Sequence, residues 1–103
     1  MSGNPLLRGL APMHPGAWLR EDILPATGPP KAEIARRLGV SRQTLYDLIA
    51  ERQPATPAMA LRLAKLFGNA PEFWLNLQRD HDLRVLEREM AEELAAIPTL
   101  DAA

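Results

Sequence analysis

Residues 31–49, KAEIARRLGVSRQTLYDLI, constrain the fold of this chain more than any other segment. A small residue at Ala35, a glycine four positions later and a leucine at position 45 form the skeleton of a helix-turn-helix. Gly39 can take the left-handed backbone conformation of a tight turn. Ala35 lets the two helices approach closely, and Leu45 packs inward from the second helix. The outer face of that helix is then free to contact a ligand.

This outer face carries residue types that read DNA. Arginine and glutamine form bidentate hydrogen bonds to guanine and adenine in the major groove, and lysine, serine and tyrosine side chains commonly contact phosphates. We therefore expect sequence-specific binding to double-stranded DNA. The expected base readers are Arg42, Gln43, Thr44 and Asp47, and the expected backbone contacts are Lys31, Ser41, Tyr46 and Arg52.

A helical hairpin with an ordinary solvated face is the simpler alternative, because helix-glycine-helix segments occur in many small bundles. Ser41 argues against it, since serine is a preferred N-cap and stands where the second helix should begin. The polar face is also rich in arginine and glutamine rather than in glutamate–lysine pairs. Together these features favour DNA binding.

Length and composition predict a single all-α domain. With 103 residues the chain can form one modest core, and its apolar residues are mainly alanine and leucine. No run approaches the ~18 apolar residues of a membrane span, and no signal peptide is evident. The absence of cysteine excludes disulfides and zinc-finger sites. We expect a cytoplasmic protein without a cofactor or metal.

Charge divides the chain into a basic middle and an acidic end, although the net charge is only −1. Residues 31–70 carry seven Lys or Arg and three Asp or Glu, a net charge of +4. Residues 71–103 carry three Arg and eight acidic residues, a net charge of −5. The basic middle suits a phosphate backbone, and the acidic end should be held away from it.

Proline, glycine and helical periodicity indicate how the helices are arranged. Pro15 should open a first helix that the PATGPP segment at 25–30 ends. Thr56 should cap a helix that Gly68 closes, and Pro71 should start a fifth helix, whose apolar stripe continues or resumes until Pro98. We expect three parts: a flexible segment at 1–13, a helix-turn-helix domain at 14–79, and an acidic helical extension and tail at 80–103.

Three segments together resemble the HigA antitoxins, a branch of the phage repressor/Cro (XRE-like) family. They are HPGAWLREDIL, the helix-turn-helix and ATPAMALRLAKLFGNAPEFWLNLQRDHDL, which cover roughly residues 13–86. The resemblance implies a five-helix bundle with a C-terminal helical extension. It also implies a homodimer on a palindromic operator that represses its own operon and neutralises a HigB-type toxin, an mRNA endoribonuclease.

The resemblance further implies a dimer interface in the fifth helix, where we expect Trp74, Leu77 and Leu83. Phe73 should lie in the core, whereas Trp18 and Trp74 are large enough to stay partly exposed, and tryptophan often anchors interfaces. The chain departs from the family pattern in two places. Pro29–Pro30 replaces a polar cap before the helix-turn-helix, and Ala70 replaces a cap of the fifth helix, which Asn69 should then supply.

Three other functions remain as alternatives. An enzyme would need converging catalytic groups, yet the two histidines, His14 and His81, stand far apart in sequence. A toxin-binding module without DNA binding, or a regulator of the XRE type without a toxin, would retain the same fold. A toxin could be bound by the first helix around Trp18. It could equally be bound by the acidic end, whose glutamates flank a stripe of Leu86, Met90 and Leu94, and that stripe could instead extend the dimer interface.

Overall fold

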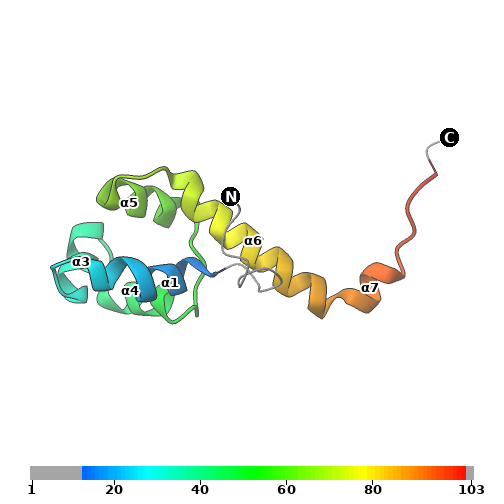
Figure 1. Ribbon diagram of the computed structural model, residues 1–103, viewed down its shortest axis with the longest axis horizontal. Helices are drawn as coiled ribbons and strands as arrows, with labels where there is room; N and C mark the ends of the chain where they lie inside the picture. The colour runs from blue at the N-terminus through cyan, green and yellow to red at the C-terminus, as the bar shows by residue number, and fades with distance from the viewer. Residues whose placement is uncertain (1–12, 102–103) are drawn as a thin grey trace.

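The computed structural model describes residues 13–101, and all regular secondary structure in this range is helical (Figure 1). The elements are α1 (Pro15–Trp18), a π-helical turn η2 (Leu19–Ile23), α2 (Leu24–Ala26), α3 (Lys31–Leu38), α4 (Arg42–Ile49), α5 (Pro57–Phe67), α6 (Pro71–Glu89) and α7 (Ala91–Ala95). The all-α prediction is confirmed. The segment predicted to be flexible lies, except for Met13, outside the described residues.

The elements α1, η2 and α2 follow one another without a break and form the first helix. It begins at Pro15 as predicted, and the His14 imidazole caps it by accepting a hydrogen bond from the Gly16 N–H at 2.9 Å. A wider turn interrupts its regular pitch, because the Leu24 N–H bonds to the carbonyl of Leu19, five residues earlier. The helix ends at Ala26, within the PATGPP segment that was predicted to end it.

Local signals place the next three helices correctly. Gly39 ends α3 with a φ of +76°, and the Val40 N–H returns to the Ala35 carbonyl at 3.1 Å. The Ser41 hydroxyl accepts a hydrogen bond from the Thr44 N–H at 3.0 Å and so caps α4. The Thr56 hydroxyl caps α5 in the same way. The predicted helix-turn-helix is thus present.

The core is assembled from side chains of every long element. Leu19, Leu45, Leu48, Leu63 and Trp74 are fully buried, and they come from the first helix, α4, α5 and α6. Trp74 therefore has no exposed rim, contrary to the prediction that it stays partly exposed. Its ring packs against one aromatic ring from α5 and one from α6, and these contacts hold the side chain in the interior.

Asn69 does not cap α6. Its side-chain oxygen accepts a hydrogen bond from the Trp74 indole N–H at 2.9 Å. The helix α6 begins at Pro71, and its N-cap residue, Ala70, provides no side-chain cap. The physical reason is the burial of Trp74, because an indole N–H removed from water requires an acceptor. The predicted cap is therefore wrong, and Asn69 instead fixes the tryptophan in the core.

Figure 1 shows α6 leaving the helical body, with α7 at its far end and α3 at the opposite end of the molecule, which measures 56 × 30 × 23 Å. We call residues 86–97 the distal arm. The helix α6 runs to Glu89, and the helical path breaks at Met90 before α7, which ends at Ala95. The apolar stripe predicted to reach Pro98 is therefore interrupted once. In the described range no helix is both long and apolar enough to cross a bilayer.

Candidate nucleic-acid interface

The α4 helix presents a buried face and a solvent face, as the sequence pattern predicts. Its inner residues Leu45, Leu48 and Ile49 are at most 7% exposed. The eight residues predicted to contact DNA come from α4, from its N-cap, from the loop that follows it and, for Lys31, from the start of α3. Six of them are exposed, namely Lys31, Ser41, Arg42, Gln43, Tyr46 and Arg52, and Thr44 and Asp47 are half-buried.

Three of these residues are joined through one carboxylate oxygen. Asp47 Oδ1 accepts a hydrogen bond from Gln43 Nε2 at 2.8 Å, and from Arg52 Nε at 3.0 Å and Nη2 at 2.8 Å. The Arg52 backbone N–H also bonds to the Asp47 carbonyl at 2.8 Å. The Arg52 guanidinium, and then the Gln43 amide, hold the pKa of Asp47 below its usual value. Sequence spacing did not reveal this cluster, which we call the Asp47 cluster.

Ser41 and Thr44 are engaged with each other at the start of α4. Besides the cap, their hydroxyl oxygens lie 2.9 Å apart and share a hydrogen bond. Ser41 therefore has a structural role that the structure shows, and its phosphate contact stays a prediction. Arg42 forms no side-chain hydrogen bond or ion pair within residues 13–101, and its guanidinium projects from the first turn of α4.

The cations of α3 divide into two groups. Lys31 is the first residue of α3 and is exposed, and Pro30 before it provides no side-chain cap. Arg36 and Arg37 both form hydrogen bonds to the Glu33 carboxylate, and these bonds, those of Arg36 first, lower the pKa of Glu33 to about 2. The basic middle counted in the sequence is thus only partly free for phosphates, because Glu33 already holds two of its arginines.

The structure brings together the two histidines that stand far apart in sequence. The His14 and His81 rings meet edge to face, with centroids 5.1 Å apart and planes at 87°. Burial, and then the neighbouring His81, lower the pKa of His14. Residues 13–101 contain no group of three or more metal-ligating side chains, and these two histidines gain no third ligand. The pair instead joins the first helix to α6.

The residues predicted for the dimer interface occupy three different environments. Trp74 is 0% exposed, so its side chain has no surface to offer to a partner, and this part of the prediction is corrected. Leu77 is half-buried against the core, and Leu83 is 55% exposed beyond it. The boundary between core and free surface on α6 therefore falls between Trp74 and Leu83.

Comparison with known proteins gives matches along most of the chain. Residues 30–75 match the helix-turn-helix family HTH_3. Antitoxin HigA-1 of Vibrio cholerae is 34% identical over 89 residues, which span 86% of this chain and 84% of that protein. The structure of antitoxin GraA in complex with its operator superposes with a TM-score of 0.83 at 38% identity, over 99% of this chain and 100% of that one.

A further solved structure, Pseudomonas aeruginosa antitoxin HigA with the higBA promoter, superposes with a TM-score of 0.81 at 32% identity. It covers 87% of this chain and 99% of that chain. The fold and the exposed α4 face define a helix-turn-helix protein of the DNA-binding class, which is not a class of enzymes. Within that class, the chain belongs to the HigA family of antitoxins.

Proposed function

We propose that this protein represses its own toxin–antitoxin operon and neutralises a HigB-type toxin. The observation that carries the DNA-binding half is the solvent face of α4, where base-reading side chains stand on a helix whose other face is locked into the core. The solved structures of GraA with its operator and of Pseudomonas aeruginosa HigA with the higBA promoter support this assignment. Operator DNA lies in the cytoplasm, so we propose that the protein acts there.

Gln43 and Arg42 are the proposed principal base readers. A carboxylate can only accept hydrogen bonds, so the bond to Asp47 turns the Gln43 amide with its nitrogen toward Asp47 and leaves its oxygen and one N–H available. An acceptor beside a donor matches the major-groove edge of adenine. Arg42, exposed on the first turn, has the bidentate geometry that suits guanine.

The four proposed phosphate contacts position the protein on the duplex. They are Lys31, Ser41, Tyr46 and Arg52, whereas Thr44 and Asp47 of α4 remain proposed base contacts. Phosphate contacts fix register without reading sequence. Asp47 carries the wrong sign for phosphate, so we propose that it acts on DNA mainly by orienting its two neighbours.

A homodimer on a palindromic operator is proposed for a geometric reason. One recognition helix covers only a few base pairs, and two of them act together when the half-sites lie about 34–36 Å apart on one face of the duplex. Leu77 and Leu83 are proposed to contribute to this interface from α6. Sedimentation at micromolar concentration tests it: a mass equal to one chain, persisting on operator DNA, contradicts the dimer.

A mobility-shift experiment tests DNA binding directly. The probe is the DNA upstream of the protein's own gene, compared with random DNA of equal length, first at low salt, where phosphate attraction is strongest. We expect tighter binding to the upstream DNA, and we expect Gln43→Ala to relax discrimination at one base pair by about 1–3 kcal/mol. No binding at low salt contradicts the DNA-binding function. Equal losses on both probes contradict the role of Gln43.

The antitoxin half is tested by co-expression with the adjacent gene. We expect the two products to co-purify and the toxin's mRNA cleavage to be suppressed. A protein that binds its operator but leaves the neighbouring product unbound and active would be a regulator of the XRE type without a toxin. A protein that binds the toxin but no DNA would be a toxin-binding module only.

A further inference from the structure

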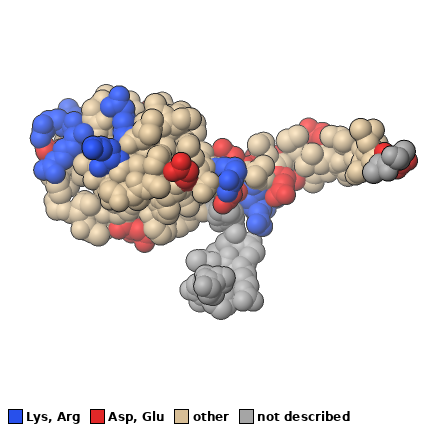
Figure 2. Space-filling view, turned by 90° about the horizontal axis from the view of Figure 1, so that it is seen from above, with Lys and Arg blue, Asp and Glu red and all other residues tan. Residues whose placement is uncertain are grey.

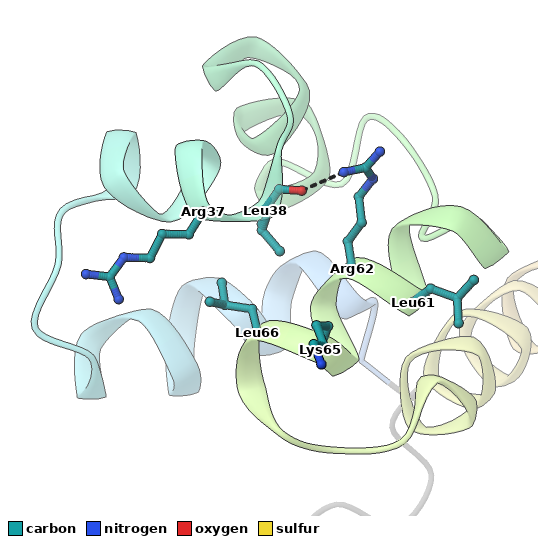
Figure 3. A pocket seen from close by; sticks show the side chains of 6 residues that line it. All are labelled: Arg37, Leu38, Leu61, Arg62, Lys65 and Leu66. Atoms are coloured by element: carbon teal, nitrogen blue, oxygen red, sulfur yellow. Dashed lines mark hydrogen bonds between the residues drawn. The ribbon is translucent and has the colours of Figure 1, made fainter.

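An open groove lies between α3 and α5 (Figure 3). Its volume is about 450 Å³, and its lining residues are Arg37, Leu38, Leu61, Arg62, Lys65 and Leu66. The lining thus combines three leucines with three cationic side chains. None of the eight residues proposed to contact DNA lines this groove, so the groove has no part in the DNA-binding proposal.

Hydrogen bonds fix two of the cationic side chains of the groove, and the groove keeps a positive surface. Arg62 Nη1 donates to the Leu38 carbonyl at 2.7 Å, which ties α5 to the end of α3 (Figure 3). Arg37 bonds to Glu33 at 2.9 Å, whereas Lys65 has no ion-pair partner in residues 13–101. Leu61 beside them is 62% exposed. Figure 2 shows Lys and Arg gathered on the body at the end opposite the arm.

The distal arm has the complementary character. Leu86, Leu94 and Ile97 are 45%, 43% and 65% exposed, so the apolar stripe has no partner within the described chain. Four glutamates accompany that stripe: Glu87, Glu89, Glu92 and Glu93. An acidic helix with exposed leucines is the kind of segment that an apolar groove with a basic rim accommodates.

We infer that each copy of this chain docks its distal arm into the groove between α3 and α5 of a second copy. The chain cannot fill its own groove, because α3 and α7 lie at opposite ends of a molecule 56 Å long (Figure 1). The inference rests on the proposed homodimer and names the surfaces that hold it together. Reciprocal docking closes a symmetric pair and leaves no open end for a chain of copies.

Helix length makes reciprocal docking feasible. At about 1.5 Å per residue, α6 extends about 18 Å from Pro71 to Leu83, and a helical path from Leu83 to Ile97 covers about 21 Å. Two α6 helices that cross antiparallel at Leu83 would therefore lay each distal arm along the first half of the partner's α6. The helix packed against that half is α5, which carries Leu61 and Lys65. The break at Met90 allows α7 to turn toward the groove.

Disulfide trapping tests this arrangement, since the natural chain contains no cysteine. Copies carrying Leu61→Cys are mixed with copies carrying Leu94→Cys under mild oxidation. Both positions are exposed, so the substitutions should not disturb folding. We expect a crosslinked dimer in the mixture and only background crosslinking for either variant alone. Mixing Leu94→Cys with Ala26→Cys, an exposed position outside the groove, provides the matched control.

A charge exchange gives a second readout. We expect Lys65→Glu and Glu93→Lys each to weaken dimerisation about tenfold in sedimentation equilibrium, and we expect their combination in one chain to restore most of it. A stable dimer in which Leu94→Cys crosslinks to itself and not to Leu61→Cys overturns the inference and leaves the homodimer standing. A protein that stays monomeric at all concentrations, without crosslinks, overturns the homodimer and the inference together.

Discussion

Asp47 and Arg52 face each other across the end of α4, where one carboxylate oxygen accepts hydrogen bonds from two nitrogens of the guanidinium, at 3.0 and 2.8 Å. The same oxygen holds the Gln43 amide at 2.8 Å. A proposed base reader and a proposed phosphate contact are therefore held in place before DNA arrives. Side chains that are already ordered lose less conformational entropy on binding.

Asp47→Ala should lower discrimination more than affinity. Without the carboxylate, Gln43 and Arg52 lose their common acceptor, whereas removal of a negative charge favours binding to any DNA. We expect the ratio of operator to random-DNA affinity to fall about tenfold, equal to about 1.4 kcal/mol. Fluorescence anisotropy with both DNAs measures it. Asp47→Asn keeps an acceptor for Gln43, so its ratio of operator to random-DNA affinity should lie between the ratios of the natural chain and of Asp47→Ala. An unchanged ratio in Asp47→Ala would contradict the orienting role.

Lys31→Ala should weaken binding to all DNA sequences alike. Lys31 is exposed at the start of α3, and a phosphate contact there carries no sequence information. The slope of log K against log salt should become shallower by about one. Affinities measured at four salt concentrations give this slope. Arg79→Ala on α6 removes one positive charge outside the interface and should leave the slope unchanged. A sequence-dependent loss for Lys31→Ala would assign it to base reading.

Gly16→Ala should destabilise the fold, because α1 passes directly over the end of α4. A Cβ at Gly16 would lie 1.8 Å from the backbone oxygen of Leu48, so one of the two helices would have to move. We expect the free energy of unfolding to fall by about 1–3 kcal/mol or more. Urea denaturation measures it against Gly28→Ala, where nothing lies within 4 Å of an added Cβ. Equal midpoints for the two variants would contradict the close approach.

His14 should make folding stability depend on pH. Burial, and then His81, lower its folded-state pKa below 6.5, so in the window beneath 6.5 the unfolded chain binds more protons than the folded one. Stability should therefore fall as the pH drops from about 7 through that window. Protonation also removes the Nδ1 acceptor of the Gly16 N–H. The decrease should be seen in thermal unfolding at pH 7.5 and 5.5.

His14→Asn is the matched variant for this effect. Asparagine retains a good N-cap acceptor and does not titrate, so the variant should lose most of the pH dependence between pH 7.5 and 5.5. His81→Gln should keep part of it, because burial is the larger cause of the lowered pKa of His14. A decrease in His14→Asn equal to that of the natural chain would assign the effect to other groups.

The amino-acid sequence by itself determined where most of the helices begin and end. The residues that mark these ends act through hydrogen bonds and dihedral limits within a few residues, so a short stretch of sequence is enough to predict them. They are Ser41, Thr56, Gly39 and the prolines at helix starts. The division of α4 into an apolar and a polar face is equally local. The candidate DNA-binding residues could therefore be named without coordinates, and their roles remain proposals.

Tertiary structure alone decided which distant groups meet. Three features depend on how the helices pack, which residue spacing does not predict. They are the His14–His81 contact, the Asn69–Trp74 hydrogen bond and the groove at which Arg62 joins α5 to α3. Trp74 illustrates the reason. A side chain of its size can lie at the surface or in the core. It lies in the core because aromatic rings pack around it and its N–H finds an acceptor there. Burial is a property of all contacting elements together, so no single segment can specify it.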